Sequence, residues 1–330
     1  MKDKNIAKEP ILEIKNLRVL FPVHKEWFPA VDGVNLSIRP GEITGVVGES
    51  GSGKSVMSQS ILRLRDHDTA VRYEGKILFE GEDLLKLSLA QMRAIRGDRI
   101  SVIFQDPLTS LSPVHTVGKQ LSEVLILHKK MAQKEAKDRA VEMLKLTGIP
   151  NPENCYRQYP YELSGGMQQR VMIATALACE PKLLIADEPT TALDVTIQEQ
   201  ILHLIRDLNE KLGMSVLFIT HDMGVVSKLC HSVRVMYLGQ VVELCGAEGI
   251  YDNPLHPYTR ALLSAVPPSS PFEEKKTIEL KGDIPSPIGD QVGCPLASRC
   301  PHCTDRCRQE CPSLKEQEPG HQVACFLYES

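Results

Sequence analysis

A glycine-rich segment at residues 48–55, with the sequence GESGSGKS, constrains this chain more than any other stretch. It follows an apolar run at residues 43–47 that predicts a buried parallel strand, and it opens a predicted helix that ends near Leu64. Glycine at the first and sixth positions, followed by Lys54 and Ser55, is the pattern of a loop that cradles phosphate. The glycines let backbone N–H groups point inward at an anion, and the helix N-terminus adds positive potential.

The polar side chains of this glycine-rich loop (residues 48–55) have predicted roles in binding phosphate and Mg²⁺. Lys54 can reach the β- and γ-phosphates, and the hydroxyl of Ser55 can hold Mg²⁺. A chance match is expected in about one chain of this length in a hundred, and the strand–turn–helix context makes it rarer. We therefore predict a site for a nucleoside triphosphate and Mg²⁺, in which the loop supplies Gly48, Ser50, Gly51, Gly53, Lys54 and Ser55.

Length and composition bound the fold and the compartment. A chain of 330 residues can bury a large core and predicts one large domain with an appendage. Its net charge of −4 predicts no general affinity for nucleic acid. No apolar run approaches the roughly 18–20 residues that cross a bilayer, and the N-terminus lacks the apolar core of a signal peptide. We therefore expect a cytoplasmic protein.

The segment before the glycine-rich loop predicts strands at residues 11–20 and 34–38. The loop predicted between them contains Phe21, Trp27 and Phe28. An adenine ring needs a flat partner on which to stack, and one of these aromatic side chains could supply it. The alternative is that all three only fill the edge of the core.

Beyond the glycine-rich loop, residues 76–79 and 99–104 predict two more strands, and Gln105 closes the second. The pattern then turns helical over residues 116–146, which predicts an inserted helical subdomain of about residues 110–172. A Gln at a strand end is usually only a cap, so Gln105 alone assigns no chemistry.

A second anion-binding pattern, LSGGMQQR, lies at residues 163–170. A Ser-Gly-Gly turn that opens a long helix presents backbone N–H groups to an anion. One phosphate does not need two such helix ends from the same chain. The alternative is that Ser164 is an ordinary N-cap before a flexible turn, and this would be favoured if the motif stood alone.

Two carboxylates follow the apolar strand predicted at residues 182–186. An acid is tolerated only at the exposed carboxyl end of such a strand, where open parallel sheets bind ligands. Asp187 is placed to bind Mg²⁺ directly or through water, and Glu188 to orient or deprotonate an attacking water. The two acids could instead cap the following turn, but the phosphate cradle upstream favours catalysis.

Further polar residues come at the next element boundaries. Asp194 precedes a helix predicted at residues 196–212, and His221 follows a strand predicted at residues 215–219. At a strand end, His221 can hydrogen-bond a γ-phosphate and sense its presence. Two further strands within residues 233–244 are expected to close the sheet near residue 250.

Taken in this order, the motifs resemble those of ABC transporter ATP-binding subunits over residues 11 to about 250. The resemblance implies an α/β P-loop NTPase with a RecA-like core, an antiparallel β subdomain and an inserted helical subdomain. It also implies Mg²⁺-dependent ATP hydrolysis by two subunits that face each other head to tail. Each ATP then lies between the glycine-rich loop of one subunit and the Ser-Gly-Gly motif of the other, which explains the two anion-binding patterns.

The resemblance also implies roles for individual residues. Gln105 touches the metal or its water and signals to the membrane subunit, and Glu188 polarises the attacking water. Asp194 couples the two sites across the dimer, and His221 contacts the γ-phosphate. The implied site residues are Glu188, His221 and Gln105 for catalysis, Gly48, Ser50, Gly51, Gly53, Lys54, Ser55, Ser164, Gly165, Gly166 and Asp194 for ATP, and Ser55, Gln105 and Asp187 for Mg²⁺.

The last part of the chain resembles the extension of dipeptide and oligopeptide importer ATPases. The likeness rests on NPLHPYTRALL at residues 253–263, on GDIPSP at residues 282–287, and on cysteine-containing segments that end with VAC at residues 323–325. We therefore predict an ABC ATP-binding domain at residues 1–252 and a C-terminal extension at residues 253–330.

This second resemblance implies a set of partners. The signature has Met167 where the commonest form has Gln, which is typical of one of two unequal ATPases. A heterodimer with a sister ATPase is therefore expected, docked on two transmembrane permease subunits at the cytoplasmic face of the inner membrane. An extracytoplasmic solute-binding protein would deliver a dipeptide or oligopeptide, and the alternative solute is nickel or another small ligand.

Two other classes of protein remain as alternatives. An ABC ATPase that acts on DNA or ribosomes would favour a basic surface or a long coiled-coil insertion, and the sequence shows neither. A regulatory or assembly ATPase could instead use its cysteine-rich C-terminal extension to handle metal and move no solute.

Six of the ten cysteines crowd into the last 37 residues. A disulfide framework is disfavoured because no export signal is visible, and a bound metal would protect the thiols from oxidation. The compact run Cys300, Cys303, Cys307 and Cys311 approaches ferredoxin spacing, but one gap is a residue too long. The resemblance implies the other ligand set, Cys294, Cys300, Cys307 and Cys325. We favour a [4Fe–4S] cluster on that set, with zinc on four thiolates as the alternative.

Overall fold

The computed structural model describes residues 9–23, 26–66, 70–106, 110–191, 194–266, 277–283, 285 and 292–329. Within these residues the chain forms two compact units. The first unit consists mainly of Lys86–Phe218, joined by the short segment Ile38–Glu42. The second consists of Leu12–Ser37, Ile43–Leu85 and the described residues from Ile219 onward.

Strand β7 of the first unit leads to the two predicted acids. Strands β6 and β7 are parallel, with Ile100 opposite Leu183 and Ile103 opposite Ala186. All five residues of β7 are buried, and its only charged residue is the last one, as predicted for a strand that ends at a ligand site. The strands lie in the order β8-β7-β6, with bounds β6 (Ile100–Ile103), β7 (Leu183–Asp187) and β8 (Ser215–Thr220).

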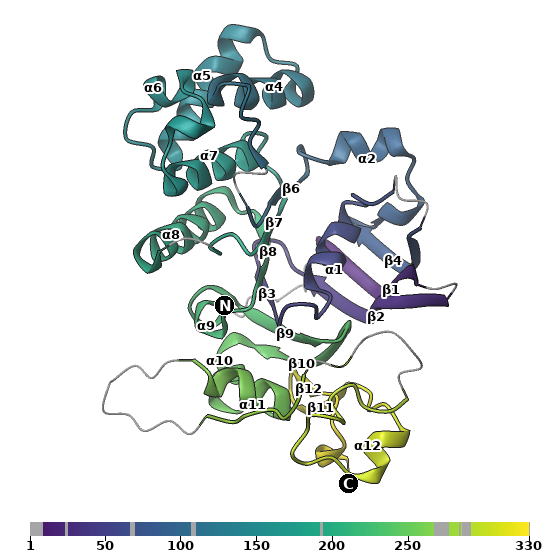
Figure 1. Ribbon diagram of the computed structural model, residues 1–330. Helices are drawn as coiled ribbons and strands as arrows, with labels where there is room; N and C mark the ends of the chain where they lie inside the picture. Colours follow the sequence, from purple (N-terminus) through teal and green to yellow (C-terminus); the bar gives the residue numbers. More distant parts are fainter. Residues whose placement is uncertain are drawn as a thin grey trace, which may run out of the picture. The chain divides into compact units, whose positions relative to one another are not determined.

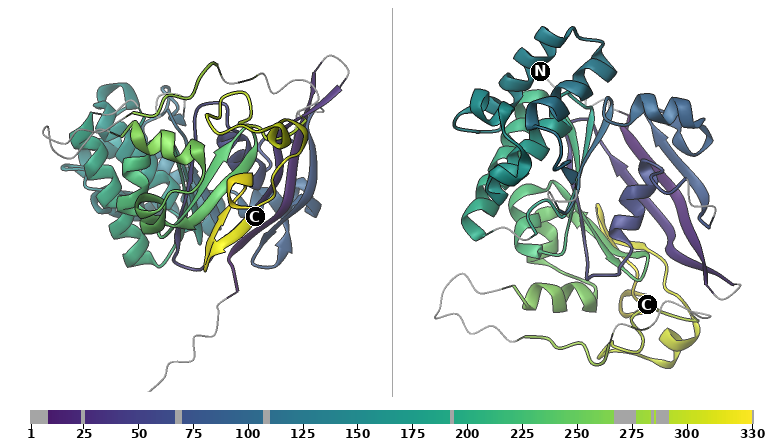
Figure 2. Two further views of the ribbon diagram at one scale, coloured as in Figure 1. Left: turned by 90° about the horizontal axis from the view of Figure 1, so that it is seen from below. Right: turned by 45° about the horizontal axis from the view of Figure 1, so that its top comes forward.

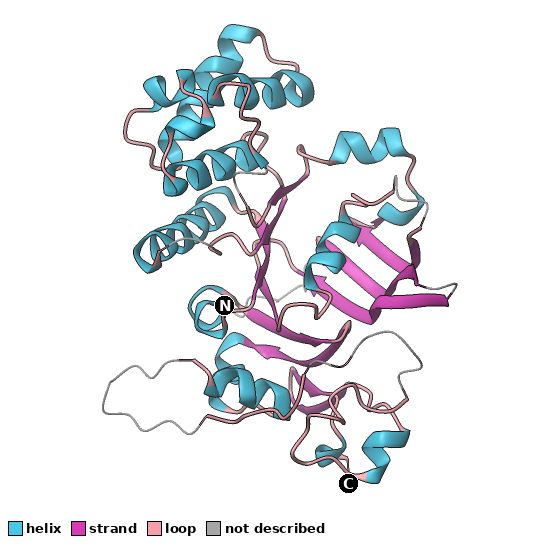
Figure 3. Ribbon diagram, viewed as in Figure 1, coloured by secondary structure: helices cyan, strands magenta, loops and turns pink. Residues whose placement is uncertain are grey.

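Helices make up the rest of the first unit. The helical run predicted at residues 116–146 is two helices, because Lys130 adopts a left-handed φ of 57° and ends the first. Figure 3 shows α4 to α7 gathered together without a strand among them. The helices are α2 (Leu89–Ile95), α4 (Val117–Lys129), α5 (Gln133–Leu146), α6 (Pro152–Arg157), α7 (Gly165–Leu177) and α8 (Val195–Leu212), with a 3₁₀ turn η2 (Pro160–Glu162).

The second unit contains an antiparallel sheet built from the N-terminal part of the chain. Strands β1 and β4 pair with Leu12 opposite Phe79 and Ile14 opposite Ile77. Figure 1 shows β1, β2 and β4 side by side. The order is β2-β1-β4-β5, with bounds β1 (Leu12–Val23), β2 (Glu26–Ile38), β4 (Arg72–Phe79) and β5 (Glu82–Asp83).

The aromatic loop predicted before the glycine-rich loop is therefore wrong. Phe21 lies on β1, while Trp27 and Phe28 lie on β2. Aromatic residues favour strands, and Pro29 is tolerated in a strand here for a positional reason. Pro29 lies on β2, an edge strand of this sheet, where a missing N–H removes no ladder hydrogen bond from the interior.

The remaining strands of this unit join the glycine-rich loop to the C-terminal extension. Strand β3 pairs in parallel with β9, and β9 turns back to pair with β10. The chain continues beyond this hairpin, since β12 pairs with β10 and places Val323 opposite Glu243. The order is β11-β12-β10-β9-β3, with bounds β3 (Ile43–Val47), β9 (Ser232–Tyr237), β10 (Gln240–Gly246), β11 (Lys315–Glu318) and β12 (His321–Val323).

The expectation that residues 233–244 close the sheet is thus wrong. The two added strands come from the far end of the chain, and Figure 2 shows them in yellow beside the green β10. Strand β11 is fully exposed and β12 has three residues, so neither has the apolar alternation that a strand prediction needs. Strand β12 is positioned by pairing with β10, and β11 by pairing with β12.

Short helices complete the second unit. The helix after the glycine-rich loop ends at Ile61, a little earlier than predicted, with Leu62 as its C-cap. The remaining helices and 3₁₀ turns begin and end as follows: α1 (Lys54–Ile61), η1 (Leu84–Lys86), α9 (Met223–Leu229), α10 (Ala247–Asp252), α11 (Pro257–Ser264), α12 (Asp305–Gln309) and η3 (Phe326–Tyr328). In the part of the chain described here, no helix has the length and apolar character needed to cross a bilayer.

A buried carboxylate ties the C-terminal extension to β10. Glu243 is fully buried and accepts hydrogen bonds from the backbone N–H groups of Leu255, at 2.8 Å, and His256, at 2.9 Å. Nε2 of His321 on β12 lies 2.8 Å from the same carboxylate. Burial lowers the pKa of His256 to about 3, so its ring is neutral and Nδ1 accepts from the N–H of Tyr258. Elements from three parts of the sequence therefore meet at one side chain.

Replacing Glu243 with Ala is expected to loosen the C-terminal extension. The change leaves two buried N–H groups and His321 without their acceptor, which costs about 3–5 kcal/mol. We expect faster amide exchange across α11 and β12 and a lower melting temperature. Glu248→Ala, an exposed position on α10, is the matched control. Unchanged exchange in both elements would show that Glu243 does not hold them.

Candidate functional site

The glycine-rich loop adopts a backbone that only glycine accommodates. Gly51 and Gly53 have φ values of 80° and 95°, in the left-handed region. A Cβ on Gly48 would overlap the carbonyl oxygen of Met236, and one on Gly53 would lie 2.5 Å from the carbonyl oxygen of Ala30. The sequence pattern therefore reflects both conformation and close packing.

Lys54 lies inside this loop, with only 4% of its surface exposed. Its Nζ donates to the carbonyl oxygens of Gly48, at 2.7 Å, and Glu49, at 2.9 Å, and lies 3.4 Å from Oγ of Ser52. Lys54 is the first residue of α1, so its ammonium group and the helix N-terminus lie at the same place. This arrangement concentrates positive potential where an anion would bind. Ser55 follows on the same helical turn and is half-buried.

The turn between β9 and β10 is hydrogen-bonded to the glycine-rich loop. The N–H of Gly239 donates to the carbonyl oxygen of Ser52, and the N–H of Asp32 donates to the carbonyl oxygen of Gly239, both at 2.9 Å. Leu238 and Gly239 both have positive φ, at 44° and 80°, which suits a tight hairpin turn. The loop is thus fixed to the sheet of its own unit.

The predicted adenine-stacking residues each lie in the second unit. The guanidinium Cζ of Arg72 lies 3.8 Å above the ring of Trp27, and that of Arg65 lies 5.5 Å from the ring centre of Phe21. These cation–π contacts occupy one face of each ring. Phe28 is half-buried on β2. Adenine stacking therefore remains a prediction for the group.

In the first unit, the structure brings Gln105 and Glu188 together. Nε2 of Gln105 donates to Oε2 of Glu188 at 3.1 Å, and Oγ1 of Thr191 donates to the same oxygen at 3.0 Å. Glu188 has a left-handed φ of 48°, which is unusual for a residue with a side chain and is typical of functional sites. Asp187 ends β7 and is 6% exposed.

Thr191 is a further candidate site residue, which the sequence analysis did not identify. Its hydroxyl holds the proposed base from a position three residues later in the chain. The only signal for it was a hydroxyl residue just after the two acids, and such residues are common in turns. Ala192 and Leu193, which follow it, lie outside the described residues.

The Ser-Gly-Gly motif forms the start of α7. Ser164 is the N-cap and accepts from the N–H of Met167 at 3.4 Å, so the capping alternative is correct for the chain by itself. Ser164 and Gly165 are nevertheless exposed at the positive end of a 13-residue helix. Nε2 of Gln168 donates to the carbonyl oxygens of Pro160, at 2.8 Å, and Leu163, at 3.3 Å, which holds the preceding turn.

Asp194 lies next to this motif within the first unit. Its carboxylate accepts from the N–H of Ile197 at 2.9 Å and so caps α8. A Cβ on Gly166 would lie 3.2 Å from Cγ2 of Ile197, so the starts of α7 and α8 are in contact. His221 belongs to the second unit, where it is exposed directly after β8. The next residue, Asp222, caps α9.

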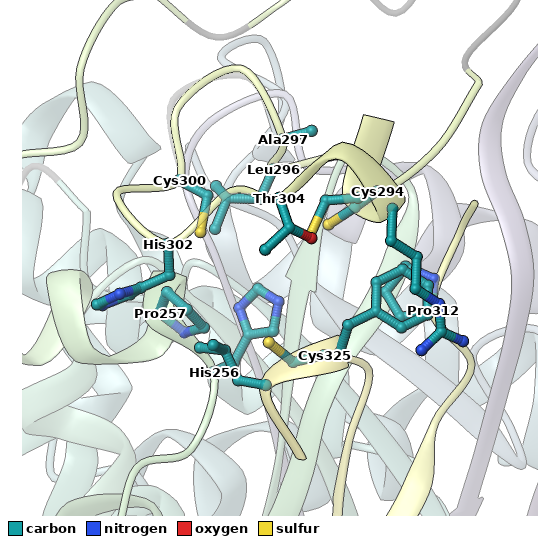
Figure 4. Close-up of a pocket in the computed structure, with 14 residues that line it drawn as sticks. His256, Pro257, Cys294, Leu296, Ala297, Cys300, His302, Thr304, Pro312 and Cys325 are labelled. Atoms are coloured by element: carbon teal, nitrogen blue, oxygen red, sulfur yellow. The ribbon is translucent and has the colours of Figure 1, made fainter. Parts of the chain in front are cut away.

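The four cysteines predicted as ligands line one cavity of about 150 Å³ in the second unit. Figure 4 shows Cys294, Cys300 and Cys325 on its wall, and Cys307 also lines it. Cys303 and Cys311 are absent from this lining. Burial raises the pKa of Cys294 to about 12, and it also raises the pKa values of Cys300 and Cys325.

Two family models match the chain. The ABC transporter family matches residues 31–191, and the family described as the oligopeptide/dipeptide transporter C-terminal region matches residues 242–307. A probable peptide ABC transporter ATP-binding protein of Sinorhizobium fredii is 50% identical, over 98% of this chain and 96% of its own. The oligopeptide transport ATP-binding protein AppD of Bacillus subtilis is 50% identical, over 97% of both chains. The dipeptide transport ATP-binding protein DppD of Escherichia coli is 46% identical, over 96% of both.

Solved structures show the same fold. An ATP-binding cassette determined as a dimer in a post-hydrolysis state with ADP and Pi matches with a TM-score of 0.64 and 33% identity. The match covers 72% of this chain and 98% of that chain. CbiO1 of Clostridium perfringens, part of an ABC transporter complex, matches with a TM-score of 0.63 and 29% identity, over 74% and 92% of the two chains.

The prediction of an iron–sulfur cluster in the C-terminal extension is wrong. Among the described residues, no group of three or more Cys, His, Asp and Glu side chains is arranged to hold a metal ion. The full-length relatives carry names of ATP-binding proteins, with no reference to a cluster. Strand pairing and the Glu243 contacts hold the C-terminal extension instead.

Proposed function

The chain belongs to the ABC transporter ATP-binding proteins, and we propose that it is the ATP-hydrolysing subunit of a membrane importer for dipeptides and oligopeptides. Near full-length identity to peptide-transport ATP-binding proteins carries this proposal. The match of residues 242–307 to the oligopeptide/dipeptide transporter C-terminal region supports the solute class. The buried Lys54 at the centre of the glycine-rich loop supports ATP as the energy source.

The proposed chemistry gives each predicted site residue a part. Lys54 binds the β- and γ-phosphates with the loop N–H groups of Gly48, Ser50, Gly51 and Gly53. The oxygens of Ser55, Gln105 and Asp187 would hold Mg²⁺, which prefers oxygen ligands. The ion would neutralise charge on the phosphates.

Glu188 is the proposed general base, and Gln105 orients it. The hydrogen bonds from Gln105 and Thr191 hold one carboxylate oxygen, which fixes the direction in which the other faces. His221 donates to the γ-phosphate. Asp194 couples the two sites of the dimer.

We propose that the subunit works as a head-to-tail heterodimer with a sister ATPase. Ser164, Gly165 and Gly166 then bind the nucleotide held by the sister subunit. The exposure of Ser164 and Gly165 at a helix N-terminus supports this role, since the N-terminus of a helix favours a bound anion. The cassette with ADP and Pi to which the chain is similar was itself solved as a dimer.

The domain organisation that we propose follows the sequence motifs. Residues 1–252 form the ATP-binding domain, residues of about 110–172 its helical subdomain, and residues 253–330 the C-terminal extension. The packing of α4 to α7 without intervening strands supports the helical subdomain. Two transmembrane permease subunits hold the ATPase at the cytoplasmic face of the inner membrane. A solute-binding protein delivers the peptide from the other side.

Uptake by the assembled transporter tests the solute. The complex of this chain with its sister ATPase and permease subunits is placed in liposomes, with ATP on the side of the ATPase. We expect ATP-dependent accumulation of a labelled dipeptide or pentapeptide when the solute-binding protein is present. Accumulation of nickel in place of peptide would show that the transporter imports nickel and would refute the proposed peptide solute. Failure of the chain to assemble with permease subunits would favour a non-transport ATPase.

Replacing Lys54 with Ala tests the nucleotide site. The change removes the ammonium group of Lys54 from the interior of the loop. We therefore expect ATP to bind at least about tenfold more weakly. Binding of a fluorescent ATP analogue to the full-length chain measures the effect. Lys76→Ala, an exposed lysine on β4 of the same unit, is the control. Equal affinity in Lys54→Ala and the parent would refute the site.

A further inference from the structure

Two side chains of the C-terminal extension contact the glycine-rich loop, and all these groups belong to the second unit. Nη1 of Arg299 lies 3.0 Å from Oε2 of Glu49. The backbone N–H of Glu49 donates to the hydroxyl oxygen of Tyr258 at 2.7 Å. Nζ of Lys54 donates to the carbonyl oxygen of Glu49 at 2.9 Å. Glu49 is therefore held by its side chain, its N–H and its carbonyl group.

The two residues of the C-terminal extension are rigidly placed. The side chain of Arg299 is 9% exposed, and Tyr258 is fully buried. Nη1 of Arg299 also lies 3.4 Å from the hydroxyl of Tyr237, whose ring centre is 4.7 Å from that of Tyr258. Among the described residues, the buried Nε of Arg299 has no hydrogen-bond partner, and Nη1 makes the polar contacts to Glu49 and Tyr237 that help to offset the burial of this charge.

The contact has two consequences for an anion at the loop. A glycine-rich backbone has many accessible conformations, and fixing Glu49 at three points reduces the entropy that nucleotide binding must overcome. The Glu49 carboxylate also lies in a loop that receives phosphates, and Arg299 neutralises its repulsion. Arg299 and Tyr258 contact Glu49 and act on the nucleotide site through it.

We propose that Arg299 and Tyr258 are positioning residues for the ATP site, through which the C-terminal extension pre-organises the glycine-rich loop. The proposal rests on ATP binding as the function of that loop. It gives the C-terminal extension a role in ATP binding, in addition to any role in assembly of the transporter. A change that displaces the extension then weakens ATP binding from a position about 250 residues away in the sequence.

Binding of a fluorescent ATP analogue with Mg²⁺ to the full-length chain tests this role. We expect Arg299→Gln to raise the dissociation constant about tenfold, since the loop loses an anchor and the Glu49 carboxylate is left unneutralised. Arg299→Lys should recover part of the loss, because it keeps the charge without the planar fork. Tyr258→Phe should act in the same direction by removing the acceptor for the Glu49 N–H. Arg306→Gln is the control, because Arg306 is ion-paired in the same extension to Glu310 and Glu329.

A double-mutant cycle excludes a general loss of folding in the extension. Glu49→Ala breaks the contact from the loop side, so we expect faster amide exchange in residues 48–53, as in Arg299→Gln, and an affinity about threefold below the parent. The double variant should bind ATP like Glu49→Ala alone, because no carboxylate remains to be neutralised. Losses that multiply in the double variant would overturn the proposal, as would parental exchange and affinity in both single variants.

The Lys54→Ala variant separates this proposal from the function on which it rests. If the parent chain binds no ATP analogue, the proposed function fails. If the parent binds, Lys54→Ala does not, and Arg299→Gln and Glu49→Ala bind as the parent does, only the positioning role fails.

Discussion

Glu188→Gln is expected to leave ATP binding intact and to slow hydrolysis by about 10²–10⁴-fold. The amide keeps the size of the side chain and an oxygen that can accept from Gln105 and Thr191. It cannot accept a proton from water, so only the chemical step suffers. Steady-state turnover of the assembled transporter, with nucleotide binding measured on the same sample, checks both parts of the prediction.

Glu180 offers a matched control for this experiment. It lies in the same unit, has a left-handed φ of 52°, and pairs with Arg139 at the surface. Glu180→Gln therefore imposes the same chemical change on a similar backbone without touching the site, and turnover should stay at the parent rate. Parent turnover in Glu188→Gln would show that another group activates the water.

The parts of the fold that depend on contiguous residues were predictable. Strand β3, the glycine-rich loop and the start of α1 lie where the sequence placed them, because phosphate binding needs their residue types in one unbroken run. The burial of β7 up to its terminal Asp187 was predictable for a similar reason. An apolar strand that ends in acidic residues fits few environments other than a buried sheet whose strand ends face a ligand site.

Contacts between distant residues left little or no signal. Strand β12 owes its position to β10, and its three residues are too few to show a periodicity. The contact of Arg299 with Glu49 joins residues 250 positions apart, and an arginine beside a cysteine gives no indication of its partner. The cysteines show the converse error, since Cys294, Cys300, Cys307 and Cys325 do line one cavity while the metal inferred from them was wrong.

Ser164→Arg is expected to leave ATP binding by the isolated subunit within about twofold of the parent and to abolish transporter turnover. Ser164 lies at the exposed start of α7 in the first unit, whereas the glycine-rich loop belongs to the second. In a head-to-tail dimer, this side chain faces the nucleotide of the sister subunit, so the bulk of arginine prevents closure. ATP-dependent association with the proposed sister ATPase, measured by size-exclusion chromatography, reports closure directly.

The substitution also removes an N-cap, which costs about 1 kcal/mol of helix stability, and this effect needs its own control. Thr116 caps α4 in the same unit by accepting from the N–H of Lys119 at 3.3 Å. Thr116→Arg loses an equivalent cap at another helix, so it should destabilise the subunit by a similar amount and still allow ATP-dependent association. If Ser164→Arg abolished nucleotide binding in the isolated subunit, Ser164 would serve its own subunit's ATP and the head-to-tail arrangement would be excluded.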